Sequence, residues 1–260
     1  MIKKYLGQNF LKNKKILDEI VRIGEVSKED TVLEVGPGHG ELTELLAKMA
    51  KKVIAVEKDK DLIPLLREKF SSNKRVKIIH EDILEFENLK LQITNYKIVA
   101  NIPYYITSRF LRTYLSDTRC RPLMIVLTVQ YEVAKRISAK PPDMNLLALS
   151  AQAYGKVEFV RKVSRGNFSP APKVDSAIIK ISEISDKFFR KNRVKEKKFF
   201  EILRQAFQQK RKMLRHSLSP KFDFKELRSR ISENFGTKRP EELSLEDWVK
   251  LSESIEIRPR

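Results

Sequence analysis

The chain has 260 residues, of which 41% are hydrophobic, so it can bury one substantial core and a smaller second domain. Its net charge of +19, from 53 Lys and Arg residues against 34 Asp and Glu residues, predicts a polyanionic partner, with nucleic acid first. One cysteine excludes an internal disulfide bond, the three histidines form no zinc-binding pattern, and no leader or membrane-spanning run is evident, so we expect a cytoplasmic, metal-free protein that does not contact membranes.

Residues 1–30 are predicted to form a basic arm followed by a helix at residues 14–23. From residue 31 to about residue 182, short β-rich apolar runs alternate with amphipathic stretches, which is the pattern of a parallel sheet covered by helices. We expect strands at residues 31–35, 52–56, 76–79, 97–100, 123–129, 157–163 and 177–181. We expect helices at residues 41–50, 61–70, 107–115, 131–138 and 146–154.

The first expected strand runs directly into Gly36, Gly38 and Gly40, and a helix follows. A glycine-rich turn between a strand and a helix lets a ligand approach the backbone closely. Glu41 stands where the dinucleotide fingerprint has its last glycine, which disfavours a pyrophosphate-binding NAD site. A cofactor with a zwitterionic amino-acid tail fits this turn better.

Acidic residues follow the next two expected strands. Glu57 ends the second strand, where its carboxylate can accept hydrogen bonds from both hydroxyls of a ribose. Asp82 follows the third strand and can accept from an adenine amine, beside the apolar residue Ile83. Because the carboxyl ends of parallel strands meet at one edge of a sheet, the glycines and the two carboxylates together predict a site for S-adenosylmethionine.

The fourth expected strand leads into Asn101-Ile102-Pro103-Tyr104, which matches the Asn/Asp-Pro-Pro-Tyr type signature of methyltransferases that act on planar amino groups. The exocyclic amine of adenine is a poor nucleophile because its lone pair is delocalised into the ring. The side-chain oxygen of Asn101 and the backbone carbonyl of Ile102 can each accept one N–H and so aim the lone pair at the methyl group. Pro103 fixes the turn, and Tyr104 offers a face for a base that has swung out of its stack.

A loop between the last two expected strands begins at Phe168 and is held extended by Pro170 and Pro172. The ring of Phe168 is predicted to cover the other face of the target adenine. Together with Tyr104, it would form an aromatic clamp.

After residue 184 the strand patterns stop, and helices are expected at residues 195–217, 223–235 and 245–254. Residues 187–215 hold twelve Lys or Arg residues and two Glu residues, over half of the net charge of +19. We therefore expect two domains, one at residues 1–184 that binds the cofactor and an all-helical, basic RNA-binding domain at residues 185–260. The predicted RNA contacts are Lys210, Arg211, Lys212 and Arg215.

These motifs, together with Gly7-Gln8-Asn9-Phe10-Leu11, resemble the KsgA family of rRNA adenine dimethyltransferases over nearly the whole chain. The resemblance implies an α/β fold with a Rossmann-like class I methyltransferase sheet and a small all-helical C-terminal domain. It also implies a monomer that uses S-adenosylmethionine to dimethylate the N6 amines of two adjacent adenines in the 3′-terminal hairpin loop of 16S rRNA, in the small ribosomal subunit, during ribosome biogenesis. In this family the Gln-Asn-Phe-Leu segment closes over the cofactor. The implied cofactor-binding residues are Gln8, Asn9, Leu11, Gly36, Gly38, Gly40, Glu57, Lys58, Asp82, Ile83 and Asn101.

The sequence departs from the family pattern at two places. Lys210 stands where the family's Phe-x-x-Arg-Arg-Lys helix has its first arginine, and only arginine binds a phosphate as a bidentate fork, so one specific contact is in doubt. Leu146-Leu147-Ala148 stands where many relatives carry Tyr-Gly, so a surface loop beside the active site is expected to differ.

Three alternatives stay open. An erythromycin-resistance methylase of large-subunit rRNA would share the fold and motifs, but the basic stretch at residues 206–215 favours the small-subunit enzyme. A non-enzymatic ribosome assembly factor is disfavoured because Asn101, Pro103 and Tyr104 are intact. A DNA adenine methylase would need a sequence-reading domain, which the sequence does not reveal.

Overall fold

The computed structural model describes residues 8–86, 95–116, 120–218 and 235–255. The chain forms two compact units, one made of Met1–Lys135 with Gly155–Ile184 and the other of Arg136–Tyr154 with Ser185–Arg260. The boundary expected after residue 184 separates the two units in the structure, but residues 136–154, expected in the first domain, belong to the second unit. Within the described ranges, no helix is long and apolar enough to cross a membrane.

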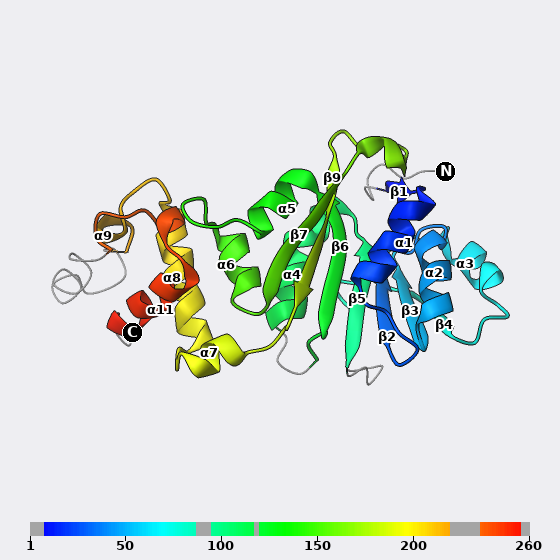
Figure 1. The fold of residues 1–260 in the computed structure, drawn as a ribbon, viewed down its shortest axis with the longest axis horizontal. Helices are drawn as coiled ribbons and strands as arrows, with labels where there is room; N and C mark the ends of the chain where they lie inside the picture. Colours follow the sequence, from blue (N-terminus) through cyan, green and yellow to red (C-terminus); the bar gives the residue numbers. More distant parts are fainter. Residues whose placement is uncertain (1–7, 87–94, 117–119, 219–234, 256–260) are drawn as a thin grey trace. The chain divides into compact units, whose positions relative to one another are not determined.

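The first unit is built on a seven-stranded sheet with the strand order β4-β3-β2-β5-β6-β9-β7 (Figure 1). Its strands are β2 (Thr31–Val35), β3 (Lys52–Glu57), β4 (Val76–His80), β5 (Tyr96–Asn101), β6 (Met124–Gln130), β7 (Lys156–Val163) and β9 (Ser176–Ser182). All seven lie within one residue of the expected bounds. The inner strands β2, β5 and β6 are almost fully buried, as is usual for parallel strands that are covered on both faces.

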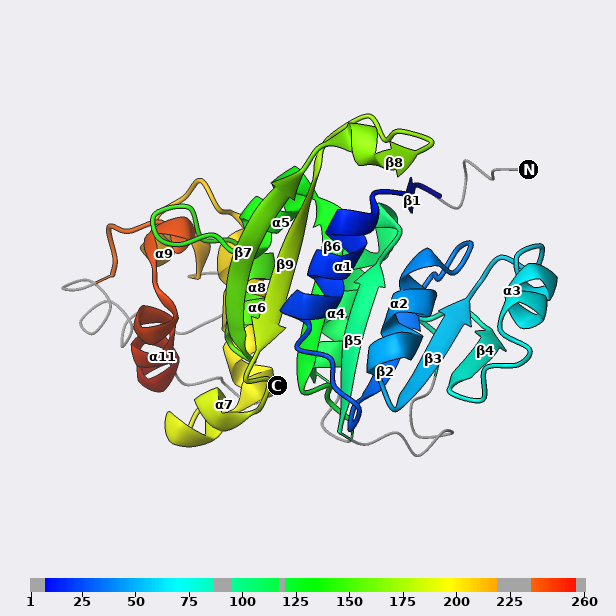
Figure 2. The same ribbon diagram turned by 45° about the vertical axis from the view of Figure 1, so that its right-hand side comes forward.

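Helices cover both faces of this sheet, as Figures 1 and 2 show. Helices α1 (Lys14–Ile23) and α2 (Glu41–Met49) lie on one face, where their apolar residues share a core with alternate strand residues such as Val32, Val99 and Val126. Helix α4 (Thr107–Ser116) lies on the opposite face, and its Tyr114 hydroxyl donates to the backbone carbonyl of Ile83 at 3.2 Å. Helices α3 (Ile63–Lys69) and α5 (Tyr131–Ile137) match two more of the expected helices.

The expectation of a parallel sheet is wrong for one strand, β9, which runs opposite to the other six. Strands β4, β3, β2, β5 and β6 run parallel, but β9 runs antiparallel to both β6 and β7. The reason is the direct connection of β7 to β9 through residues 164–175, which contains only the short 3-10 helix η4 (Arg165–Asn167) and β8 (Phe168–Ser169). Adjacent strands that are joined without a crossover helix pair antiparallel.

A second, two-stranded sheet was not expected from the sequence. Strand β1 (Phe10–Leu11) pairs antiparallel with β8, so that Leu11 lies opposite Phe168. Backbone N–H of Lys12 also donates to the carbonyl of Asn167 at 2.9 Å. These hydrogen bonds connect residues 10–12, before α1, to residues 167–169 in the loop between β7 and β9.

The second unit is helical. It contains α6 (Leu146–Gln152), α7 (Lys187–Lys191), α8 (Glu196–Gln208), α9 (Leu214–Ser217) and α11 (Leu245–Ser254), around a core that includes Phe199, Leu214 and Trp248. The prediction of one helix at residues 195–217 is wrong, because α8 ends at Gln208 and a turn follows, which allows Leu214 and Leu218 to be buried. The helix predicted at residues 245–254 is confirmed, whereas the one predicted at residues 223–235 lies, except for its last residue, outside the described residues.

Candidate functional site

The glycine-rich turn lies at the carboxyl end of β2. Gly36, Gly38 and Gly40 have φ angles of 64°, 61° and 82°, in the left-handed region that favours glycine. The backbone N–H of Gly36 donates to Val56 at 2.9 Å, and Gly40 caps the first turn of α2. Gly36 and Gly38 of this turn line a cavity at the end of the sheet.

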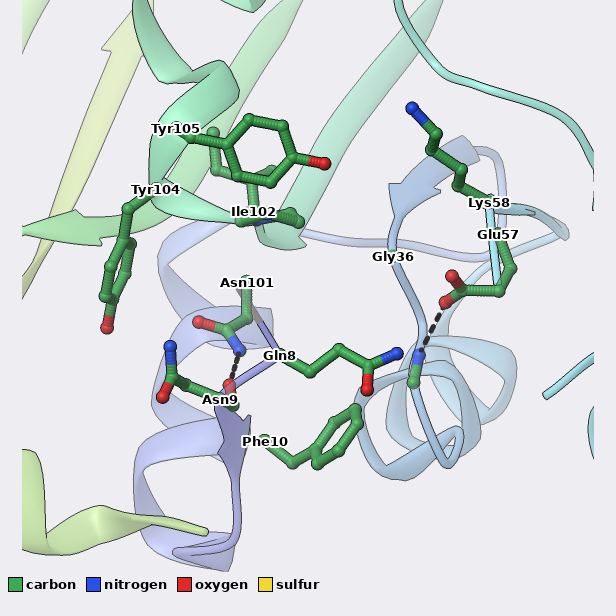
Figure 3. Close-up of a pocket in the computed structure, with 12 residues that line it drawn as sticks. Gln8, Asn9, Phe10, Gly36, Glu57, Lys58, Asn101, Ile102, Tyr104 and Tyr105 are labelled. Atoms are coloured by element: carbon green, nitrogen blue, oxygen red, sulfur yellow. Dashed lines mark hydrogen bonds between the residues drawn. The ribbon is translucent and has the colours of Figure 1, made fainter. Parts of the chain in front are cut away.

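Glu57 ends the neighbouring strand β3 and is held by backbone N–H groups. Its Oε2 accepts from Gly38 at 3.2 Å, and its Oε1 accepts from Asp59 at 2.8 Å. Burial raises the pKa of Glu57, and these two hydrogen bonds oppose the increase. Two backbone N–H groups thus fix the carboxylate of Glu57, which lines the cavity (Figure 3).

Asp82 lies beyond β4 and forms an ion pair with Lys58, whose Nζ is 2.7 Å from Oδ2. Its second oxygen accepts from the backbone N–H of Leu84 at 3.0 Å. Burial alone would raise the pKa of Asp82, but the hydrogen bonds from Lys58 and Leu84 outweigh it and lower the pKa. Asp82 is therefore a charged acceptor near the end of the sheet.

The tetrapeptide that begins at Asn101 follows β5 at the same edge. The side-chain Nδ2 of Asn101 donates to the backbone carbonyl of Asn9 at 2.9 Å, and Figure 3 shows its oxygen pointing to the side on which Tyr104 lies. The Tyr104 hydroxyl is 2.6 Å from the hydroxyl of Ser176, which fixes the ring at the start of the short 3-10 helix η3 (Tyr104–Ile106). Burial raises the pKa of Tyr104, so the phenol stays protonated at neutral pH.

Residues 8–11, which we call the N-terminal strap, lie against this edge of the sheet. Gln8 Nε2 donates to Asp59 Oδ2 at 2.7 Å. The ring of Phe10 meets the ring of His39 edge-on, with their centroids 4.3 Å apart, and it lies so close to Gly38 that a Cβ atom there would be 2.6 Å from it. The strap is thus held at both the glycine turn and Asn101.

These groups line a cavity of about 60 Å³ that opens to solvent (Figure 3). Its lining includes ten of the predicted site residues, namely Gln8, Asn9, Gly36, Gly38, Glu57, Lys58, Asn101, Ile102, Pro103 and Tyr104. Sequence reasoning missed two lining residues, Phe10 and Tyr105, although each stands inside or beside a motif that it singled out. Within the ranges that the structure describes, no cluster of His, Cys, Asp and Glu side chains could hold a metal ion.

The structure does not bring the other predicted site residues to the lining of this cavity. Leu11 and Phe168 face each other across the two small strands, and both are buried in the core, with Phe168 only 5% exposed. Gly40 packs against the ring of Phe70, Asp82 is ion-paired with Lys58, and Ile83 is buried. The four predicted RNA contacts belong to the second unit, where they are exposed in the turn after α8 and on α9: Lys210, Arg211, Lys212 and Arg215.

Comparisons with known proteins show what the whole chain is similar to. A family model described as Ribosomal RNA adenine dimethylase matches residues 1–256. The chain is 40% identical over 260 residues to the Ribosomal RNA small subunit methyltransferase A of Clostridium botulinum (strain Loch Maree / Type A3), with 97% of this chain and 93% of that protein covered. It is 42% identical over 255 residues to the protein of the same name from Dehalococcoides mccartyi (strain CBDB1), with 96% and 87% covered.

Solved structures confirm the predicted fold class. A dimethyladenosine transferase from Plasmodium falciparum matches with 27% identity and a TM-score of 0.81, over 93% of this chain and 95% of that one. The 23S rRNA methyltransferase ErmE matches with 26% identity and a TM-score of 0.77, over 95% and 99%. The Rossmann-like class I methyltransferase sheet and the C-terminal helices are thus shared with both.

Proposed function

Because the chain belongs to the ribosomal RNA adenine dimethylase family, we propose that it is the 16S rRNA adenine dimethyltransferase, which methylates the N6 amine of adenines in the small ribosomal subunit. The two relatives that carry this name match at 40% and 42% identity over at least 96% of the chain. The names of both relatives specify small-subunit rRNA, and this supports the same substrate for the present chain.

The fold alone does not separate this function from large-subunit methylation. The dimethyladenosine transferase and the 23S rRNA methyltransferase match with similar TM-scores of 0.81 and 0.77 and similar identities of 27% and 26%. The identity of about 40% to small-subunit enzymes is what favours 16S rRNA. We extend the proposal to two adjacent adenines in the 3′-terminal hairpin loop, each methylated twice during ribosome biogenesis in the cytoplasm by a single copy of the chain.

The residues at the cavity fit S-adenosylmethionine as the methyl donor. Glu57 lines the cavity and can accept from a ribose diol, and Gly36 lines it without a side chain that would exclude an amino-acid tail. The charged Asp82 can accept from an adenine amine if Lys58 turns aside. When bound, this cofactor supplies an electrophilic methyl group on a sulfonium. The proposed binding residues are the predicted ones that line the cavity, together with Asp82 and with Phe10, which was not predicted from the sequence.

The chemistry of the acceptor amine depends on Asn101, whose orientation is the observation that carries the proposal. A carbonyl oxygen can only accept, so the bond to Asn9 places the Asn101 NH₂ group against the strap and leaves Oδ1 on the other side. Oδ1 can then accept one N–H of the adenine amine, and the backbone carbonyl of Ile102 can accept the other. Both contacts localise the nitrogen lone pair without a strong base.

Tyr104 holds the target base in this proposal. Its ring is fixed through Ser176 and lies on the side to which Asn101 Oδ1 points (Figure 3). An adenine that has swung out of its stack can lie on this ring with its amine at Asn101. Phe168 would reach the other face of the base only if β8 left its pairing with β1, because its ring is buried in the described conformation.

The test is methyl transfer from radiolabelled S-adenosylmethionine to small and large ribosomal subunits of a strain that lacks this dimethylation, followed by mapping of the labelled base. Label in two adjacent adenines of the small subunit supports the proposal. Label confined to the large subunit would identify a resistance-type methylase. No label on either subunit, with cofactor binding retained, would favour an assembly factor without enzymatic activity.

A further inference from the structure

Tyr105 is an aromatic residue at the cavity that the proposed chemistry does not use. It follows Tyr104 in η3, it lines the cavity, and it is 59% exposed. Figure 3 shows that the two tyrosine side chains point apart, because Tyr104 extends past Asn101 whereas the hydroxyl of Tyr105 points toward the side that carries Lys58. The ring of Tyr105 therefore stands at the mouth of the cavity with much of its surface in contact with solvent.

Positive charge lies on the same rim. Arg109 is exposed and lies four residues after Tyr105, near the start of α4. The pKa of Asp82, which burial alone would raise, is lowered by Lys58 and also by Arg109, so Arg109 lies near that carboxylate. The pKa of Lys58 is raised first by its hydrogen bond to Asp82, and the nearby phenol of Tyr105 adds to this increase.

An exposed aromatic ring at the mouth of the cavity can bind the nucleotide next to the target base. A base that enters the cavity must leave its stack, so the neighbouring base loses a stacking partner on one face. An aromatic side chain at the mouth can replace that partner, and stacking of this kind tolerates any base. The positive charge of Lys58, which lines the cavity, favours the RNA backbone that leads into it.

We infer that Tyr105 is a stacking platform for the nucleotide next to the target adenine. This inference rests on the proposed function. In the proposed substrate the neighbouring nucleotide is the second adenine, so the platform holds one adenine while the other is methylated.

The first experiment measures methyl transfer to small subunits by the wild-type protein and by Tyr105→Ala and Tyr105→Phe. The matched control is Leu65→Ala, which truncates another exposed apolar side chain, on α3, that does not line the cavity. Tyr105→Ala should lower kcat/KM for the subunit about tenfold and leave the KM for S-adenosylmethionine within about twofold. Tyr105→Phe should recover most of the loss, because it keeps the ring.

The second experiment identifies the stacked base by equilibrium binding. The probes are a hairpin RNA with the intact loop and two versions in which the nucleotide on either side of the target adenine is abasic. Tyr105→Ala should weaken binding of the intact hairpin about tenfold, and this loss should disappear with one of the abasic hairpins, because the ring then has no base to stack on.

An equal loss with all three hairpins, or no loss with the intact one, would overturn the inference. Equal binding of the intact and abasic hairpins by the wild-type protein would overturn it as well. Failure of the proposed function would look different, since the wild-type protein would then transfer no methyl group to small subunits in the first experiment.

Discussion

The side-chain nitrogen of Asn101 donates to the backbone carbonyl of Asn9 at 2.9 Å, and this bond joins the end of β5 to the N-terminal strap. The two ends of the Asn101 side-chain amide therefore have different roles. Its NH₂ group holds the strap, and its oxygen is left free to face the side on which Tyr104 lies (Figure 3). In the proposed function, Asn101 would therefore link the position of the strap to the orientation of the acceptor amine.

Asn101→Ala should cost about 3 kcal/mol of transition-state stabilisation, because it removes a preorganised acceptor of the adenine amine. Single-turnover methyl transfer to small subunits measures the loss, and subunit affinity should change little. Asn73→Ala removes the same functional groups near the start of β4, at the opposite edge of the sheet, and serves as the control. Near-normal turnover by Asn101→Ala would contradict the assigned role.

Gly38→Ala should weaken cofactor binding by about tenfold or more. The new Cβ atom would lie 2.6 Å from the ring of Phe10, and the φ angle of +61° is strained for alanine, by about 1 kcal/mol. Calorimetric titration with S-adenosylhomocysteine measures the effect. Gly166→Ala is the control, since a Cβ atom there meets only Ser164 Oγ at 3.9 Å.

Adding Phe10→Ala tests the cause of this effect. If the clash pushes the strap away from the glycine turn, the double variant should bind the cofactor less weakly than the sum of the two single losses predicts. Strictly additive losses would mean that the strain at Gly38, and not its contact with Phe10, is responsible.

The sequence predicted the strands well because each is a short apolar run that ends in a turn or a polar residue. Val32 to Val35 and Val53 to Val56 are buried in full, and their ends carry Gly36 and Glu57, so the position of the site followed from the direction of the strands. The reversal of β9 could not be predicted in this way. The side-chain pattern of a strand is the same in either direction, and only the connection through residues 164–175 decides it.

Short elements and side-chain burial were the other sources of error. Strands β1 and β8 have two residues each, too few for any alternation, and their pairing turns Phe168 into the core instead of toward the cavity. Tyr105 could have been noticed only from its exposure, since its type and position beside Tyr104 are equally compatible with burial. The end of α8 at Gln208 depends on Leu214, which becomes buried by leaving the helical path.

Charge reversal at Lys210, Arg211 and Lys212 should weaken binding to small subunits and flatten its salt dependence. Each phosphate contact that is lost should reduce the slope of log K against log salt by about 0.7 to 0.9. Reversal at Lys74, Arg75 and Lys77 changes the net charge equally, but these exposed residues lie at the amino end of β4, away from the site edge. An unchanged slope in the first variant, or equal losses in both, would place the RNA surface elsewhere.

Glu34, in the middle of the buried strand β2, should make the protein less stable as the pH rises. Burial raises the pKa of Glu34 from 4.5 to about 8, and the carboxylates of Glu57 and Glu41 add to the increase. Its Oε2 has no hydrogen-bond partner in the described part of the chain. The folded state therefore binds one more proton than the unfolded state between these two pKa values.

The sign of the effect follows from that extra proton. The stability that the protonated carboxyl contributes is complete below pH 4.5 and is lost as the pH rises through about 8. Glu34→Gln does not titrate, so the free energy of unfolding of the wild-type protein should fall relative to that of Glu34→Gln by up to about 1.4 kcal/mol per pH unit. Urea unfolding followed by circular dichroism at several pH values in this window measures the difference. The exposed Glu29→Gln is the control and should follow the wild-type slope. A constant difference between wild type and Glu34→Gln across the window would mean that Glu34 is ionised in the folded protein.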